Sequence, residues 1–255
     1  MQLARQTFVV TGGASGLGAA VAKDFLAAGA NVALLDRQPC DLGGFSPIDQ
    51  ALCHSLLADV TQFDQVVSAF DQALARFGSI QGVVHCAGVI HAEKILGKSG
   101  PHDAAAFAKV LQINLIGTFH VLTVAATRMT SSPPQVDDER GVIILTSSIA
   151  ASEGQIGQIA YAASKAGVAG LTLPAARELA RHGIRVVTIA PGVFDTHMLA
   201  GLRDDARDSL ATQVPFPRRL GQPAEFAALA RHIVENALLN GCVIRLDGGL
   251  RMSAQ

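Results

Sequence analysis

Three side chains in the second half of the sequence have the types and spacing for acid–base chemistry on an alcohol or a ketone. Tyr161 and Lys165 are four residues apart, which on a helix places the phenol and the ammonium on one face. A tyrosine of ordinary pKa, about 10, is a poor proton acceptor at neutral pH. A cation about 4 Å away favours the phenolate by roughly 4 kcal/mol at an effective dielectric near 20, so we expect Lys165 to lower the pKa of Tyr161. The Ser148 hydroxyl, earlier in the chain, could hold a carbonyl oxygen facing the phenol.

The same residues also have a purely structural explanation. In most proteins a tyrosine and a lysine with this spacing are a packed phenol and a solvated ammonium. The pair alone therefore leaves both interpretations open, and a decision needs a second site in the same chain.

A glycine-rich loop near the N-terminus provides a candidate for that second site. The residues Thr11-Gly12-Gly13-Ala14-Ser15-Gly16-Leu17-Gly18 follow an apolar run and open a helical pattern. Glycines let a backbone approach a pyrophosphate, and the amides at a helix N-terminus bind its charge. A glycine-rich turn without a ligand is the alternative for the loop taken alone. In this context we predict dinucleotide binding by Gly12, Ser15, Gly16, Leu17 and Gly18.

Acidic residues after the next two apolar runs bear on the choice of dinucleotide. Asp36 is placed where a carboxylate accepts hydrogen bonds from both ribose hydroxyls and repels a 2′-phosphate. Arg37 favours NADP instead, because a guanidinium could pair with that phosphate. The charges favour NAD over NADP. Asp59 and Val60 could reach the adenine, unless Asp59 only caps the helix expected from Gln62.

The elements that must position these residues follow from an alternation of short apolar runs and longer helical patterns. Runs that are apolar throughout are typical of strands covered on both faces, so we predict an α/β fold: a single Rossmann-like, doubly wound domain with a seven-stranded parallel sheet flanked by helices on both faces. The expected strands are Phe8–Val10, Val32–Leu35, Leu52–Leu57, Gly82–His85, Val142–Leu145, Arg185–Ile189 and Cys242–Leu246. The expected helices are Gly16–Ala28, Gln62–Phe77, Asp103–Met129, Gln158–His182 and Pro223–Asn236.

The connections differ in character. The segment between the second and third strands has no clear helical pattern, and the polar, proline-bearing residues 131–140 predict a surface loop. Residues 192–217 mix charges with apolar side chains and predict a substrate lid. With no internal repeat or linker-like change in composition, residues 1–255 are expected to form a single domain.

Composition excludes several classes of protein. Hydrophobic residues make up 49% of the chain and charged residues 16%, which is incompatible with disorder. The apolar runs are too interrupted for a membrane span, and a net charge of −1 without basic clusters argues against nucleic-acid binding. The four cysteines and eight histidines show no ligand spacing, so we predict no metal site. Reduced thiols and a start without a signal-peptide pattern predict a cytoplasmic location.

In this order and on this framework, the glycine loop, Ser148 and the Tyr161–Lys165 pair resemble the short-chain dehydrogenase/reductase family. The resemblance covers essentially the whole chain and extends to His85-Cys86-Ala87-Gly88, Asn114 and Pro191-Gly192. Membership implies that Tyr161 transfers the proton, while Lys165 lowers its pKa and holds the nicotinamide ribose. It further implies that Ser148 positions the carbonyl and that Asn114 supports a water relay to Lys165. Cofactor contacts are implied for Cys86, Ala87 and Gly88.

A narrower resemblance is to the type II 3-hydroxyacyl-CoA dehydrogenases. It is carried by Glu153–Gln158, Thr172–Arg177, Val214–Gly221 and Asn240–Gly249, and by the loop Lys98–His102, where that branch carries an insertion. The branch implies NAD, a homotetramer and oxidation of 3-hydroxyacyl-CoA to 3-oxoacyl-CoA. It also implies that Gln155 lies near the substrate and that Phe194 and Thr196 contact the cofactor.

Two other functions remain open from the sequence. A steroid or another small secondary alcohol would suit the same catalytic set, because the lid decides the substrate. A dinucleotide-sensing protein without turnover is disfavoured, because a sensor has no need of a tuned phenol. Four arginines could bind the phosphates of an acyl-CoA, namely Arg203, Arg207, Arg218 and Arg219. The alternative is that they are exposed charges that keep the protein soluble. The closing segment Ile244–Gly249 is expected at a sheet edge that an assembly would cover.

Overall fold

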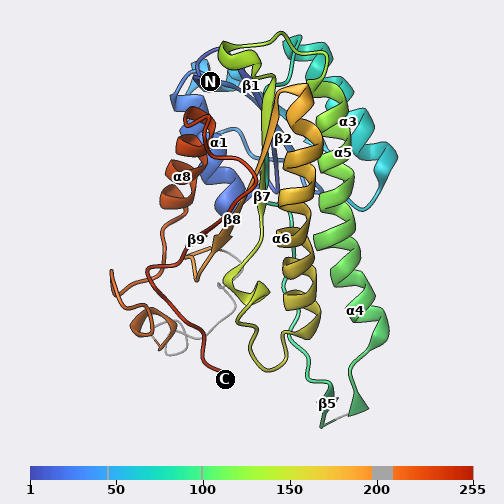
Figure 1. Ribbon diagram of the computed structural model, residues 1–255, viewed down its shortest axis with the longest axis vertical. Coiled ribbons are helices and arrows are strands. Elements are labelled where there is room, and N and C mark those ends of the chain that lie inside the picture. Colours follow the sequence, from blue (N-terminus) through green and yellow to red (C-terminus); the bar gives the residue numbers. More distant parts are fainter. Residues whose placement is uncertain (45, 99, 197–208, 255) are drawn as a thin grey trace.

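A single parallel sheet organises the molecule (Figure 1). The computed structural model describes residues 1–44, 46–98, 100–196 and 209–254, and within them seven strands pair in the order β3-β2-β1-β4-β7-β8-β9. These strands are β1 (Thr7–Thr11), β2 (Asn31–Asp36), β3 (Cys53–Leu57), β4 (Gly82–His85), β7 (Gly141–Thr146), β8 (Ile184–Pro191) and β9 (Val243–Leu246). The predicted doubly wound α/β fold is confirmed.

Burial explains why the strand sequences are apolar throughout. Every residue of β1, β4, β7 and β8 is buried, as expected for parallel strands covered on both faces. Successive side chains point to opposite faces, so Phe8 and Val9 of β1 enter different hydrophobic clusters. The strand β9 pairs with β8 and forms one edge of the sheet, as predicted for the closing segment.

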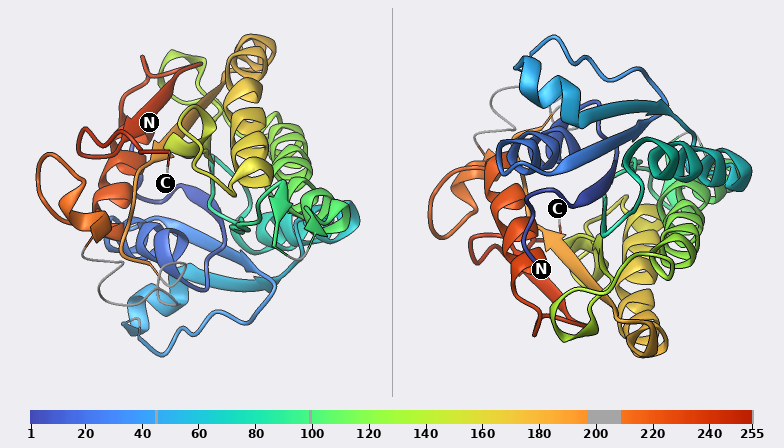
Figure 2. Two further views of the ribbon diagram at one scale, coloured as in Figure 1. Left: turned by 90° about the horizontal axis from the view of Figure 1, so that it is seen from below. Right: turned by 90° about the horizontal axis from the view of Figure 1, so that it is seen from above.

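Helices cover the two faces as separate layers (Figures 1 and 2). One face carries α1 (Gly16–Ala27) and α8 (Pro223–Glu235), which share a cluster in which the ring of Phe8 meets Phe25 edge-on at 4.9 Å between centroids. The other face carries α3 (Phe63–Phe77), α5 (Gly117–Met129) and α6 (Ile159–Leu179), whose apolar residues share the second cluster. Both layers bury aliphatic side chains against the sheet, which is the principal stabilising contribution.

The long helix predicted over Asp103–Met129 is interrupted. It consists of α4 (Ala104–Leu111), a π-helical turn η1 (Gln112–Ile116) and α5, so Asn114 lies in the irregular turn. Such turns frequently occur at functional sites. By length and composition the segment Ala104–Met129 could cross a membrane, but half of its most apolar stretch is buried within the fold, as in a core helix.

The connections add short elements that the sequence did not predict. The helix α2 (Pro47–Leu52) precedes β3, so the third strand begins one residue later than predicted. A small antiparallel hairpin, β5 (Leu96–Gly97) and β6 (Gly100–Pro101), projects beside α4 (Figure 1). Turns of 3₁₀ helix occur at η2 (Val136–Asp138) in the predicted surface loop, at η3 (Ile149–Ala151), and at η4 (Ala180–His182), which forms the end of the helix predicted over Gln158–His182.

Candidate active site

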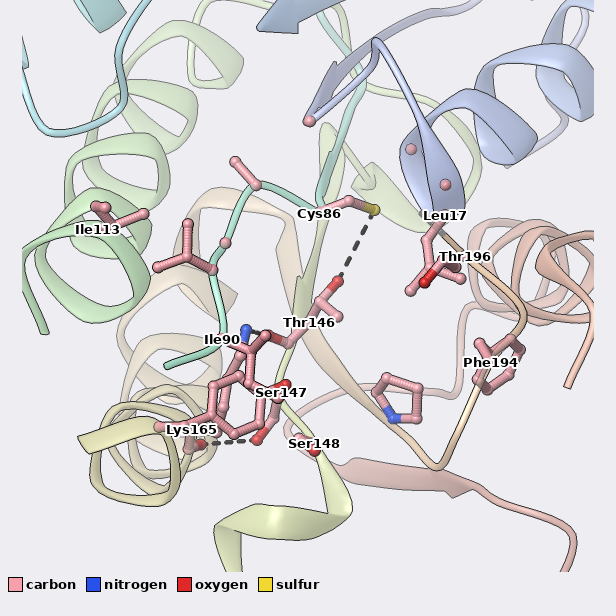
Figure 3. A pocket seen from close by; sticks show the side chains of 18 of the residues that line it. Leu17, Cys86, Ile90, Ile113, Thr146, Ser147, Ser148, Lys165, Phe194 and Thr196 are labelled. Atoms are coloured by element: carbon pink, nitrogen blue, oxygen red, sulfur yellow. Dashed lines mark hydrogen bonds between the residues drawn. The ribbon is translucent and has the colours of Figure 1, made fainter. Parts of the chain in front are cut away.

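A cavity of about 770 Å³ opens at the carboxyl ends of the strands (Figure 3). Its wall includes the ends of β1 and β4, which lie side by side where the strand order reverses direction, and ligands bind open α/β sheets at such a switch point. The structure brings to this cavity every site residue predicted from the sequence except Asn114: Gly12, Ser15, Gly16, Leu17, Gly18, Asp36, Asp59, Val60, Cys86, Ala87, Gly88, Ser148, Gln155, Tyr161, Lys165, Phe194 and Thr196. Their roles remain predictions.

The glycine loop is shaped for close approach. Gly12 has a φ of 68°, and a Cβ added there would lie 2.9 Å from the backbone nitrogen of Ala87. The backbone therefore passes the segment after β4 at a distance that only glycine allows. Because α1 begins at Gly16, the unpaired amides of its first turn lie at the cavity and can bind phosphate oxygens.

The end of β2 supplies the carboxylate expected there. Asp36 accepts hydrogen bonds from the backbone nitrogens of Ala14, at 3.1 Å, and Gln38, at 3.2 Å. These two amides fix the carboxylate at the rim beside the glycine loop, and each of its oxygens keeps a second acceptor site. The neighbouring Arg37 also lines the cavity, so the negative charge that favours NAD and the positive charge that favours NADP both lie at this wall.

Asp59 and Val60 lie where the adenine contact was predicted. Asp59 Oδ1 accepts a hydrogen bond from the Thr61 nitrogen at 2.9 Å, which is a local turn. The N-cap of α3 is Gln62, so the capping alternative for Asp59 is wrong. Asp59 therefore stabilises the turn that presents Val60 to the cavity.

Tyr161 and Lys165 share one face of α6, as their spacing predicted. The Lys165 Nζ lies 5.8 Å from the centre of the Tyr161 ring and donates a hydrogen bond to the backbone oxygen of Thr146 at 2.9 Å. Burial raises the pKa of Tyr161 above its ordinary value, while a hydrogen bond with the Ser148 hydroxyl lowers it by less. In the cofactor-free protein the net shift is thus opposite to the lowering expected from Lys165, because desolvation outweighs the hydrogen bond with Ser148.

Lys165 sits in an apolar setting that weakens its charged form. Burial lowers its pKa to about 8, and the Cys86 thiol beside it has a pKa raised to about 12 by burial. The Thr146 hydroxyl donates to Cys86 Sγ at 3.9 Å, while the Thr146 carbonyl holds Lys165 (Figure 3). Thr146 thus links the lysine to Cys86 in the segment after β4, a position that no sequence motif indicated.

Asn114 lies behind the cavity wall. Its Oδ1 accepts from the Val89 nitrogen at 2.8 Å, and its Nδ2 donates to the Val89 oxygen at 2.9 Å and to Ser164 Oγ at 3.0 Å. The side chain therefore ties the π turn to the segment after β4 and to α6. The water relay to Lys165 that the family resemblance implies remains a prediction.

The segment after β4 is held by a buried histidine. His85 Nδ1 lies 2.7 Å from Thr11 Oγ1, which also accepts from the Ala87 nitrogen at 3.2 Å. Burial lowers the pKa of His85 to about 3, so the ring is neutral at physiological pH. Thr11 and His85 therefore fix the backbone that carries Cys86, Ala87 and Gly88 along the cavity.

The C-terminal residues form part of the cavity wall beside Gln155. Gln155 Nε2 donates to the Ser253 oxygen at 3.3 Å, and the Ile156 nitrogen donates to the Ala254 oxygen at 3.0 Å. Met252 consequently reaches the cavity wall, although nothing in its sequence context predicted it. Several further lining residues that sequence reasoning missed are apolar and lack any motif, among them Val89, Ile90, Ile113 and Leu210.

The predicted lid, residues 192–217, is described in part. Phe194 and Thr196 both line the cavity (Figure 3). Phe194 packs edge-on against Phe226 at 6.4 Å between centroids, and Thr196 approaches Gly16. Residues 197–208, which include Arg203 and Arg207, lie outside the described residues. Arg219 forms two 2.8 Å hydrogen bonds with Glu225, which commits its guanidinium to a carboxylate.

Comparison with known proteins gives consistent results. The family model "short chain dehydrogenase" matches residues 6–207. The 3-hydroxyacyl-CoA dehydrogenase type-2 of Bos taurus is 49% identical over 246 residues, covering 96% of this chain and 94% of its own. The Drosophila melanogaster protein of the same name is 47% identical over 249 residues, covering 96% of each chain.

A solved structure agrees with these sequences. The crystal structure of 3-hydroxyacyl-CoA dehydrogenase type-2 from Mycobacterium avium superposes with a TM-score of 0.89 at 38% identity, covering 98% of this chain and 97% of that one. The fold, the cavity at the switch point and the converging Ser148, Tyr161 and Lys165 fit the same group of enzymes. This chain belongs to the short chain dehydrogenase family and, with it, to the nicotinamide-dinucleotide enzymes.

Proposed function

We propose that this protein is an NAD-dependent 3-hydroxyacyl-CoA dehydrogenase, which interconverts a 3-hydroxyacyl-CoA and the corresponding 3-oxoacyl-CoA. One observation carries the proposal: a single cavity joins Ser148, Tyr161 and Lys165 to the glycine loop and to Asp36. Ser148, Tyr161 and Lys165 suit the oxidation of a secondary alcohol. The acyl-CoA class is supported by sequence identities of 49% and 47% with relatives that are named for this activity.

The residues present fit a dinucleotide. The absence of a side chain at Gly12 lets the glycine loop pack closely against Ala87, and the first turn of α1 offers amides for the pyrophosphate. Asp36 would accept from the adenosine ribose hydroxyls, and its charge opposes a 2′-phosphate, which supports NAD rather than NADP. When bound, NAD supplies the acceptor for the hydride that leaves the carbinol carbon.

The chain's own residues handle the proton. The Tyr161 phenolate accepts the hydroxyl proton as the O–H bond breaks and the C=O bond forms, and the reverse transfer accompanies ketone reduction. Ser148, whose hydroxyl bonds with the phenol, holds the substrate oxygen within reach of it. The Lys165 ammonium, fixed by the Thr146 oxygen, favours the negative charge on the phenolate.

The substrate side of the cavity supports an acyl chain. Ile90, Ile113, Leu210 and Met252 line it with flexible or branched aliphatic groups, which exclude water from the reacting atoms. A thioester-linked chain buries well against such a surface, because each methylene contributes about 0.8 kcal/mol on burial.

A substrate panel tests this proposal. NADH formation would be followed with 3-hydroxyacyl-CoAs of increasing chain length and with α-methyl branching, beside the corresponding free 3-hydroxy acids and hydroxysteroids. We expect the CoA esters to give the highest kcat/KM, and Ser148→Ala to reduce it by about 100-fold. Higher kcat/KM with hydroxysteroids than with every CoA ester would contradict the substrate assignment while leaving the dehydrogenase chemistry intact.

We also propose that the protein assembles as a homotetramer. The support is the edge strand β9, where Val243 remains 43% exposed, because an assembly that covers such an edge protects its apolar residues. Light scattering coupled to size-exclusion chromatography tests this, and a monomer at micromolar concentration would contradict it.

A further inference from the structure

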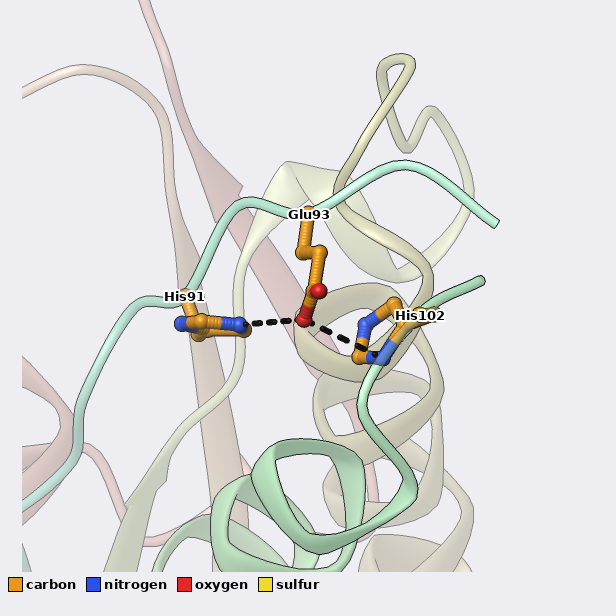
Figure 4. A group of neighbouring side chains, drawn as sticks. All are labelled: His91, Glu93 and His102. Atoms are coloured by element: carbon orange, nitrogen blue, oxygen red, sulfur yellow. Dashed lines mark hydrogen bonds and ion pairs between the residues drawn. The ribbon is translucent and has the colours of Figure 1, made fainter. Parts of the chain in front are cut away.

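A cluster of three side chains next to the cavity wall carries chemistry that the dehydrogenase reaction does not use (Figure 4). Glu93 Oε2 lies 3.1 Å from His91 Nε2 and 3.3 Å from His102 Nδ1. The ligand-type atoms of the three residues all lie within 4.8 Å of one another. His91 and Glu93 belong to the segment after β4, and His102 directly follows β6, so the hairpin brings together residues that are separated in the sequence.

The spacing of these atoms suits one bound cation. In a tetrahedral zinc site with bonds of about 2.0–2.2 Å, neighbouring donor atoms lie about 3.3 Å apart. The two contacts of Glu93 are already close to this separation. The His91 side chain is 39% exposed, so its ring can adjust to complete the site.

We propose that His91, Glu93 and His102 bind one divalent transition-metal ion of the zinc class. Two imidazole nitrogens and one carboxylate oxygen form a donor set that zinc prefers, whereas calcium and magnesium prefer oxygen donors alone. Three protein ligands leave a further position for water or another donor. The ion would have no part in hydride or proton transfer at Tyr161.

The surrounding contacts hold two of the ligands, Glu93 and His102, in place before any ion binds. Glu93 Oε1 accepts from the Asp103 nitrogen at 3.2 Å, which orients the other carboxylate oxygen toward the histidines. The His102 ring meets the Phe107 ring edge-on at 6.1 Å between centroids, and the side chain is 9% exposed. A site that is ordered in advance binds with a smaller loss of conformational entropy.

The protonation of His102 is compatible with binding. In the metal-free protein Nδ1 also lies 2.9 Å from the Asp103 carbonyl oxygen. A proton on Nδ1 is therefore donated to this oxygen and to the Glu93 carboxylate. An ion at Nδ1 replaces that proton, and the ring then carries its proton on Nε2. Nε2 is buried without a hydrogen-bond partner among the described residues, so it is an unpaired acceptor before binding and an unpaired donor after it.

The position of the cluster indicates what the ion would do. The Glu93 nitrogen donates to the Gly157 oxygen at 2.8 Å, next to the start of the helix that carries Tyr161. Ile90 and Ala92, on the same segment as His91, line the active-site cavity. An ion joining His91 and Glu93 to His102 would therefore fasten this wall of the cavity to the base of the β5–β6 hairpin.

Metal titration of the full-length protein tests the proposal. After treatment with a chelator and its removal, calorimetric titration with Zn²⁺ is expected to show one site per chain. His91→Gln and Glu93→Gln should each weaken binding at least about tenfold, since loss of even an outer-shell partner has an effect of this size. His182→Gln, which removes a histidine paired with Arg181 on the surface, is the matched control and should bind as the unaltered protein does.

Titration with Co²⁺ identifies the ligands independently. Visible bands without a thiolate charge-transfer absorption are expected, because the cluster contains no sulfur. Absence of stoichiometric binding, binding that both His91→Gln and Glu93→Gln leave unchanged, or a thiolate band would overturn the proposal. The more exposed His91→Gln decides the matter if Glu93→Gln does not fold, and equal thermal melting of the metal-free variants confirms that the fold is retained.

Discussion

The Lys165 ammonium lies 5.8 Å from the centre of the Tyr161 ring while its hydrogen bond is directed to the Thr146 carbonyl. In this arrangement burial, rather than the lysine charge, determines the pKa of the phenol in the cofactor-free protein, and that pKa is raised. A bound, positively charged nicotinamide would add the second cation. We therefore predict that the phenol becomes an efficient base when oxidised cofactor is bound.

Titration of the phenol tests this dependence on cofactor. The chain has one tyrosine, so the phenolate absorbance of the whole protein reports on Tyr161 alone. Without cofactor we expect its pKa above the ordinary value of about 10, and with saturating NAD⁺ we expect it to fall by one unit or more. The same pKa with and without NAD⁺ would contradict the coupling.

Removal of the charge at Asp36 should change the choice of cofactor. In Asp36→Asn the repulsion of a 2′-phosphate is lost and Arg37 is left to attract it, so the ratio of kcat/KM for NAD to that for NADP should fall by tenfold or more, equivalent to about 1.4 kcal/mol. Adding Arg37→Gln to this variant should reverse the gain with NADP. If the ratio does not move in Asp36→Asn, this carboxylate does not select the cofactor.

Burial of Lys165 predicts a dependence of stability on pH. Its pKa is lowered from 10.5 to about 8, so between these values the unfolded chain binds the proton more tightly than the folded one. The contribution of Lys165 to the free energy of unfolding should therefore rise with pH from about 8 to 10.5, by about 3 kcal/mol in total. Urea unfolding of the unaltered protein and of Lys165→Met measures it: the difference between them should shift in favour of lysine as the pH rises. A difference independent of pH would contradict the burial of the ammonium.

The neutral His85 predicts a loss of stability in acid. Its pKa is lowered from 6.5 to about 3, so as the pH falls below 6.5 the unfolded chain takes up a proton that the folded chain refuses. At about pH 4 this reduces the free energy of unfolding by about 3 kcal/mol relative to pH 7. In His85→Asn that part of the acid sensitivity should disappear, as measured by urea unfolding at both pH values. Equal acid sensitivity of the two proteins would show that His85 is not buried as a neutral ring.

Much of the fold was predictable because its strands are buried on both faces. The apolar runs from Phe8, Val142 and Arg185 had no competing interpretation once helical patterns alternated with them. The π turn around Asn114 was not predictable, because its residues also fit a regular helix. The helix α2 and the β5–β6 hairpin were missed because both are short.

Some residues of the candidate site were predictable from the sequence, and others required the structure. Residues in motifs, such as Gly12 and Tyr161, were located from the sequence because their chemistry requires particular residue types at fixed spacing. Thr146 acts through its backbone oxygen, which any residue possesses, and Met252 reaches the cavity only through the path of the C-terminal segment. The raised pKa of Tyr161 also required the structure, since spacing gives the position of a charge but not the extent of burial.

The most direct test of the proposed function is the single-site variant Tyr161→Phe, which keeps the ring and removes the proton acceptor. With saturating NAD⁺ and a 3-hydroxyacyl-CoA substrate, we predict that kcat for NADH formation falls by at least about 100-fold, while the Kd for NAD⁺ changes by less than about fivefold. Equal thermal melting and NAD⁺ binding would establish that the variant is folded. Undiminished oxidation of the substrate by this folded variant would contradict the assignment of Tyr161 as the catalytic base.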